Sequence, residues 1–196
     1  MYQNYFSLPI GNTFSFVYLS GYFYLAASNY FYKTNTNFGL IASSYTAATY
    51  RGSTYDASSG YFYVASQGYS RIDVFNTGCS LIRTISVSTG VGGGVAFYNN
   101  MMYVSSGAAQ ISVLQNSVVT KVFNINVCSS WLGQIVFDAF GNLAIACQFN
   151  NLVVLYDYNG NYLGKLPSTS TYPCQAALDS EGRLVVATYY ALDIYY

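Results

Sequence analysis

The fold is decided by five similar segments, GYFYLAAS (21–28), GYFYVASQ (60–67), NMMYVSSG (100–107), GNLAIACQ (141–148) and GRLVVATY (182–189). They recur at spacings of 39, 40, 41 and 41 residues when aligned on Leu25, Val64, Val104, Ile145 and Val186. A fixed period of this length is typical of repeat architectures, in which each repeat is one supersecondary unit. We therefore read the chain as five degenerate repeats of about forty residues.

Turn and strand signals surround each segment. An Asp-x-x-Gly turn or a near variant precedes three of them, at Asp56, Asp138 and Asp179. Short apolar runs follow, namely RIDVF (71–75), QISVL (110–114), LVVLY (152–156) and LDIYY (192–196). Fourth strands are expected at LIRTISV (81–87), VVTKVFNI (118–125) and NYLGKL (161–166), after turns such as TGCS and YNGN. Each repeat is thus predicted to be four short antiparallel strands, a to d. The aligned segment is strand b, and the short apolar run after it is strand c.

A lone sheet of this kind would expose an apolar face, and stacking such sheets around an axis buries those faces. The sequence therefore predicts one all-β domain over 1–196, a five-bladed β-propeller. The expected blade cores lie near 14–48, 52–88, 92–127, 132–168, and 173–196 together with 2–9. Since NYFSLP (4–9) resembles NYLGKLP (161–167), we expect the N-terminal strand to complete the last blade. The alternative is a piece of a longer array that closes a larger ring.

The repeat consensus resembles the NHL-repeat class of β-propellers. The best matches are LDSEGRLVVA (178–187), SRIDVF (70–75) and VVLYDYNGNYLGKL (153–166), and the similarity extends from about residue 50. The resemblance implies the propeller fold and says little about function, because such propellers include binding modules and a few enzymes.

Charge is scarce and balanced. Charged residues make up 7% of the chain, with seven basic residues, seven acidic ones and no His, against roughly 25% charged in a typical soluble domain. The basic residues are scattered, which argues against nucleic acid. No apolar run is long enough for a membrane-spanning helix, and no signal peptide is visible at the start. A surface this neutral favours association between copies.

Catalytic and metal signals are weak. Asp56, Asp138 and Asp179 share one turn position, and Asp73 and Asp193 share a position in strand c. Repetition around a ring suggests scaffold roles, because a catalytic pair needs carboxylates that converge. The usual His base is missing, and no ligand cluster for zinc or calcium is present. We expect no enzyme activity, no cofactor and no metal.

A glycine run, TGVGGGV (89–95), lacks the Lys and the helix of a phosphate-binding loop. Its place between strand d of one repeat and strand a of the next suits close backbone packing near the propeller axis.

Aromatic residues recur on one face. Tyr30, Tyr69, Phe149, Tyr189 and Tyr190 follow strand b, and the connections to the next repeat carry Tyr50, Trp131 and Tyr172. In a propeller these turns and connections share a face, so the rings predict an aromatic collar. Such rings stack on sugars or anchor a protein partner. The alternative role is to cover the apolar ends of the blades.

Four cysteines show no CxxC spacing. They are interpreted either as thiols packed as small apolar groups or, for one pair, as a disulfide. The pair that the ring would bring near is Cys147, which ends strand b of the fourth repeat, and Cys174, which enters strand a of the fifth.

The leading functional hypothesis is a non-enzymatic structural or interaction module that binds copies of itself or other proteins. Low charge with abundant Tyr, Asn and Ser suits an extracellular fibre, coat or matrix assembly. The alternatives are a lectin-like propeller that binds glycans through the collar and, third, a propeller enzyme of the lyase or hydrolase kind.

Overall fold

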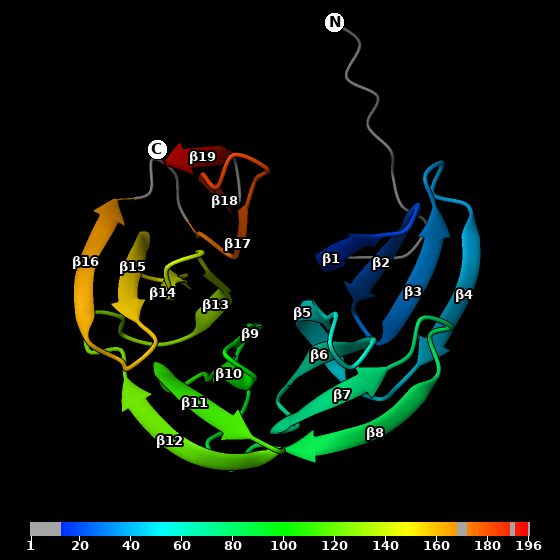
Figure 1. The fold of residues 1–196 in the computed structure, drawn as a ribbon, viewed down its shortest axis with the longest axis horizontal. Coiled ribbons are helices and arrows are strands. Elements are labelled where there is room, and N and C mark those ends of the chain that lie inside the picture. Colours follow the sequence, from blue (N-terminus) through cyan, green and yellow to red (C-terminus); the bar gives the residue numbers. More distant parts are fainter. Residues whose placement is uncertain (1–12, 168–171, 189–190, 196) are drawn as a thin grey trace, which may run out of the picture.

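The computed structural model describes residues 13–167, 172–188 and 191–195, which form strands and connecting turns. The strands build five antiparallel sheets arranged around a central axis, and each sheet comes from one repeat (Figure 1). The prediction of an all-β, five-bladed propeller is confirmed. Residues 2–9 lie outside the described residues, so their pairing with the last blade stays a prediction.

The first two blades are regular four-stranded meanders. Blade 1 contains β1 (Thr13–Leu19), β2 (Tyr22–Ala27), β3 (Tyr30–Asn35) and β4 (Leu40–Tyr45). Blade 2 contains β5 (Thr49–Asp56), β6 (Tyr61–Gln67), β7 (Arg71–Phe75) and β8 (Leu81–Ser86).

The other three blades follow the same order. Blade 3 contains β9 (Val95–Tyr98), β10 (Met101–Ser105), β11 (Gln110–Gln115) and β12 (Val118–Asn124). Blade 4 contains β13 (Leu132–Phe137), β14 (Asn142–Cys147), β15 (Leu152–Asp157) and β16 (Tyr162–Pro167). In blade 5 the described strands are β17 (Gln175–Leu178), β18 (Leu184–Ala187) and β19 (Leu192–Tyr195).

Most of the core lies between neighbouring blades, and one small cluster of Leu25, Ala27 and Tyr32 lies within blade 1. Tyr24 and Phe31 of blade 1 pack against Phe62 and Phe75 of blade 2, and the Tyr24 and Phe62 ring centroids are 4.1 Å apart. Similar apolar clusters join blades 2 and 3, blades 3 and 4, and blades 4 and 5. The second strands of blades 1 to 4 are buried on both faces, which explains why their sequences are almost continuously apolar.

The first strand of each blade lines the axis, and in blades 1 to 4 the fourth strand forms the rim (Figure 1). Three of the inner strands, β1, β5 and β13, carry one extra residue relative to the strand beside them, a β-bulge near their start. A bulge moves the residues before it to the opposite face of the sheet. The bulges thus decide which side chains of the inner strands reach the core and which reach the axis.

Backbone segments come close together around the axis. A Cβ at Gly94 would lie 2.6 Å from the carbonyl oxygen of Gly133, and one at Gly93 would lie 3.1 Å from that of Leu132. The Ser105 hydroxyl accepts hydrogen bonds from the N–H groups of Gly93, at 3.2 Å, and Gly94, at 2.7 Å. The close packing expected of the glycine run is therefore present.

Candidate functional site

A small polar pocket lies where the inner strands begin. It has a volume of about 100 Å³, and Arg51, Gln67, Trp131, Gln148 and Gln175 contribute to its wall. Arg51 Nε donates a hydrogen bond to Gln67 Oε1 at 2.6 Å, and Gln175 Nε2 donates to the Arg51 carbonyl at 3.5 Å. Burial lowers the pKa of Arg51 from its ordinary value. The pocket therefore places a partly desolvated guanidinium and several amides beside one indole ring.

A larger cavity follows along the same inner strands and shares Gln175 with the polar pocket. It measures about 690 Å³, within the usual range for ligand sites, and its wall is mainly apolar. Gln134 is an exception, because its Nε2 donates to the carbonyls of Ser53 and Val95 at 3.4 and 3.3 Å. Its buried Oε1 has no hydrogen-bond partner within the described part of the chain. The central channel thus combines a small pocket that has several polar side chains with a larger cavity whose wall is mainly apolar.

Five members of the predicted aromatic collar are exposed, namely Tyr30, Tyr69, Trp131, Phe149 and Tyr172. Phe149 and Tyr172 come together edge to face at 5.9 Å, although they belong to different connections. Tyr69 packs against the Arg71 guanidinium at 5.4 Å. Trp131 lines the polar pocket, and Tyr189 and Tyr190 lie outside the described residues.

Tyr50 does not belong to this exposed set, so its assignment to the collar is wrong. Its side chain is 0% exposed, and its hydroxyl donates to Asp73 Oδ2 at 2.8 Å while accepting from Thr46 Oγ1 at 2.6 Å. The cause is the bulge in β5 between Tyr50 and Ser53, which turns the ring into the core between blades 1 and 2. Arg71 Nε completes the network 2.9 Å from Asp73 Oδ1.

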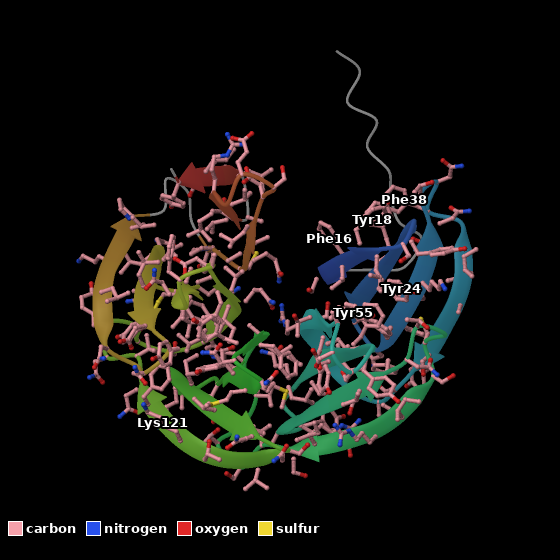
Figure 2. The ribbon with its side chains drawn as sticks, viewed as in Figure 1. Phe16, Tyr18, Tyr24, Phe38, Tyr55 and Lys121 are labelled. Atoms are coloured by element: carbon pink, nitrogen blue, oxygen red, sulfur yellow. A yellow bond between two sulfur atoms is a disulfide. The ribbon has the colours of Figure 1, made fainter. Side chains whose placement is uncertain are left out.

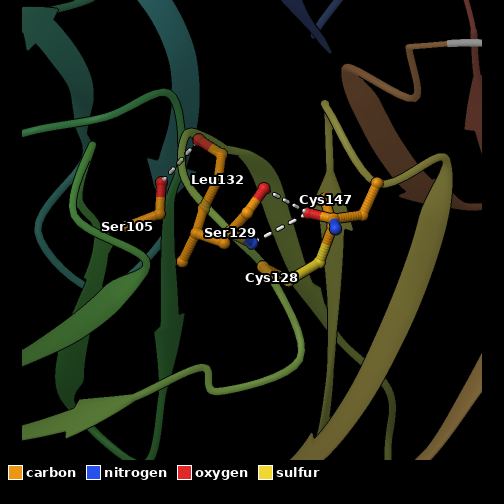
Figure 3. Close-up of a disulfide and its surroundings, with 6 residues drawn as sticks. Ser105, Cys128, Ser129, Leu132 and Cys147 are labelled. Carbon is orange, nitrogen blue, oxygen red and sulfur yellow. Dashed lines mark hydrogen bonds between the residues drawn. A yellow bond between two sulfur atoms is a disulfide. The ribbon is translucent and has the colours of Figure 1, made fainter.

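The proposed pairing of Cys147 with Cys174 is also wrong. Cys147 forms a disulfide with Cys128, with 5.7 Å between the Cα atoms (Figure 3). Cys128 lies in the connection that leads into β13, and β13 pairs with β14 so that Leu132 is opposite Cys147. The connection therefore passes the end of β14, closer than the next blade does. Cys174 is a free thiol whose pKa is raised by burial, which disfavours the nucleophilic thiolate.

The acidic turns have the predicted scaffold role. The Asp138 carboxylate accepts from the N–H groups of Phe140 and Asn142 at 2.9 and 2.8 Å. The Asp179 carboxylate accepts from those of Glu181 and Arg183, both at 2.9 Å. In the same way, the Asp56 carboxylate accepts a hydrogen bond from the N–H group of Ser58. Each carboxylate thus closes its own turn. Among the described residues no group of three or more His, Cys, Asp and Glu is close enough to hold a metal.

The rim carries exposed apolar side chains on every blade whose fourth strand is described. They include Leu40 and Ile41 on β4, Leu81 and Ile82 on β8, Val118 and Val122 on β12, and Tyr162 and Leu163 on β16. Among the described strands these four pair on one side only, so the backbone groups of their other edge are available to pair with another strand. No helix in the described part of the chain is long and apolar enough to cross a membrane.

Comparison with known proteins supports the fold. No family model matches the chain, and no curated protein sequence matches it either. The chain is similar in structure to the WD40 β-propeller domain of Doa1, with a TM-score of 0.75 and 15% identity over 93% of this chain. The fold is that of a β-propeller.

Two further solved propeller-like structures are similar. One is a protein of unknown function from Bacteroides caccae, with a TM-score of 0.74 and 11% identity, matching 90% of this chain and 70% of that one. The other is a selenomethionine-substituted virginiamycin B lyase from Staphylococcus aureus, with a TM-score of 0.72 and 10% identity over 91% of this chain. The chain spans 62% of the Doa1 structure and 64% of the lyase, less than two thirds of each.

Sequence reasoning missed the polar side chains of the channel. Arg51 could have been found, since it is the one residue among the seven basic ones that lies on an inner strand. Gln67 and Gln148 close two of the aligned segments at equivalent positions, and Gln134 and Gln175 are equivalent in the next pair of inner strands. The common signal is an amide or cation at a repeat position that faces the axis.

Proposed function

We propose that this propeller is a non-enzymatic interaction module that associates with copies of itself through the strands of its rim. The observation that supports this most directly is the exposure of large apolar side chains on β4, β8, β12 and β16, next to free sheet edges. Since the formal net charge is zero and only 7% of the residues are charged, electrostatic repulsion between copies is weak.

The assembly that we propose is an extracellular fibre, coat or matrix. The Cys128–Cys147 disulfide supports an oxidising compartment, because disulfides form and persist there. The quoted repeat motifs support NHL-type repeats as the class to which the blades belong.

Sedimentation velocity over a wide range of protein concentrations tests self-association. We expect a weight-average mass that rises with concentration and persists in high salt, because apolar contacts are not screened by salt. The same measurement in low salt serves as the comparison. A monodisperse monomer throughout the range would overturn the proposal.

Trp131 and the polar pocket favour a second candidate, a glycan-binding propeller. Trp131 and Tyr172 occupy equivalent places before β13 and β17, and both have positive φ angles, of 41° and 57°. Bulky residues seldom adopt this left-handed conformation, and such strain concentrates at ligand sites. An indole next to a guanidinium and amides is suited to stacking on a sugar ring while hydrogen-bonding its hydroxyl groups.

The indole also supplies the assay, since Trp131 is the one tryptophan in the sequence. Titration with a panel of neutral and acidic oligosaccharides is expected to shift its fluorescence, and Arg51→Met is expected to weaken that shift. Fluorescence that stays unchanged across the panel would remove this candidate and leave self-association unaffected.

A further inference from the structure

One rim strand differs from the others in charge. Arg83 lies on β8, Lys121 on β12, and Lys165 on β16, where Pro167 also ends the strand. The sequence of β4, LIASSY, contains no charged residue and no proline. Charged residues and proline on an edge strand are the usual features that prevent pairing with another chain. Among the four rim strands described, β4 alone lacks both.

β4 and β8 have equivalent positions along their length. In each c–d pair the rim strand carries one extra residue at the same place, which is Ile41 in β4 and Ile82 in β8. Their exposed fractions are 54% and 47%. The residue after the bulge is Ala42 in β4 and Arg83 in β8. The two strands therefore share geometry and apolar exposure, and they differ in the cation.

Pairing a strand with its own copy makes this difference decisive. A two-fold axis at the centre of an antiparallel pair places each residue opposite its mirror position. For β12 that pairing brings two Lys121 residues opposite each other. For β8 and β16 it places the cations of the two copies next to the two-fold axis. Like charges in such positions are destabilising. For β4 it places Leu40 opposite Tyr45 and Ile41 opposite Ser44, which opposes no charges.

The charge on the adjacent strand is directed away from this edge. Lys33 of β3 is paired with Ala42, and its Nζ donates to the carbonyl of Thr77 in blade 2 at 3.2 Å. The same ammonium lies 4.2 Å from the centroid of the Tyr22 ring. In Figure 1, β4 forms the outermost ribbon of blade 1, with its far edge facing outward.

We propose that β4 is the docking edge for a second copy of this chain, which adds its own β4 as an antiparallel strand to form a continuous sheet across a two-fold axis. This inference rests on the proposed self-association and assigns it to one strand. In blade 5 the residues predicted to pair with β19 lie outside the described part of the chain.

The test compares Ile41→Lys with the matched control Ile82→Lys. Both replace an exposed bulge isoleucine of a rim strand by the same cation, so they change net charge and surface hydrophobicity equally. Sedimentation equilibrium is expected to show the dimer dissociation constant of Ile41→Lys increased roughly tenfold or more, about 1.4 kcal/mol or more. Ile82→Lys is expected to remain like the parent chain. Thermal unfolding at a concentration where the parent is monomeric should be the same for both variants.

A second variant, Ser43→Lys, places the charge at another exposed position of β4 and should reproduce the loss. If the parent chain is monomeric at every concentration, the proposed function fails and this inference fails with it. If the parent associates but Ile41→Lys and Ser43→Lys associate equally well, the assignment to β4 is overturned while self-association stands. Loss with Ile82→Lys alone would move the interface to β8.

Discussion

Removing the Cys128–Cys147 disulfide should cost this propeller a measurable share of its stability. The bridge joins residues that are 19 apart in sequence, so it closes a loop of about twenty residues. In the chain-entropy model, a loop of this length makes the unfolded state less favourable by about 3 kcal/mol. For a domain of this size, that corresponds to a fall in Tm of roughly 6–12 °C. Both cysteines are buried, so replacement by alanine also removes some packing in the core between blades 3 and 4.

The assay is urea unfolding of the parent chain and of the double variant Cys128→Ala, Cys147→Ala, each with and without a reducing agent. We expect the reductant to lower the free energy of unfolding of the parent chain toward that of the double variant, which should stay lower because it also lacks the packing of the two sulfur atoms. The double variant should not respond, because Cys79 and Cys174 are already free thiols. A parent chain that loses under about 1 kcal/mol on reduction would refute the loop-entropy reasoning. An equal response of the double variant would show that the reductant acts elsewhere.

Three further predictions concern the packing and the charges. Gly52→Ala should destabilise by about 1–3 kcal/mol, because a Cβ there would overlap the Gly93 carbonyl; in thermal denaturation Gly164→Ala, which meets open space, should differ little from the parent. Tyr50→Phe should cost about 1–3 kcal/mol in urea unfolding, since it removes a donor from a buried carboxylate, and an unchanged midpoint would contradict the network. Hydrogen bonds within the turns hold the carboxylate pKa values of Asp56, Asp157 and Asp179 below their ordinary 3.8, and for Asp179 the largest contribution comes from Arg183. The stability that these carboxylates contribute is therefore present above about pH 4 and is lost as pH falls through their lowered pKa values in the folded state. A Tm that stays flat from pH 5 to about pH 2 would contradict this for the turns of Asp56, Asp157 and Asp179.

The repeat and its turns could be predicted because each depends on local chemistry. An Asp followed by a Gly closes its own turn wherever it stands, as Asp138 and Asp179 do with the N–H groups that follow them. The apolar second strands of blades 1 to 4 reflect burial on both faces, which stacked sheets supply. These signals lie within a single repeat, so alignment of the five repeats was enough to find them.

The errors arose where one residue changes the geometry. The connection to the second repeat is predicted to carry Tyr50 as an exposed ring, but β5 already begins at Thr49, and its bulge between Tyr50 and Ser53 turns the ring into the core between blades 1 and 2. The disulfide depended on the path of the connection before β13, which brings Cys128 rather than Cys174 to the end of β14. Neither a bulge nor the path of a connection has a signal in residue spacing alone.

The channel could not be predicted for a different reason. Residues from blades that are not neighbours pack against each other across the propeller axis. Gly52 and Gln134 occupy equivalent positions on β5 and β13, which are not neighbouring blades. A Cβ at Gly52 would overlap Gln134 Oε1, and Gln134 Nε2 donates to the adjacent Ser53 carbonyl. The large side chain on one blade thus occupies the space that the missing side chain on another leaves. Alignment of repeats treats these two residues as variants of one position, whereas the ring makes them complementary partners. It follows that the same residue at both positions, whether glutamine or glycine, should disrupt this packing in the channel. Each of the two residues is nevertheless native to this position of the repeat.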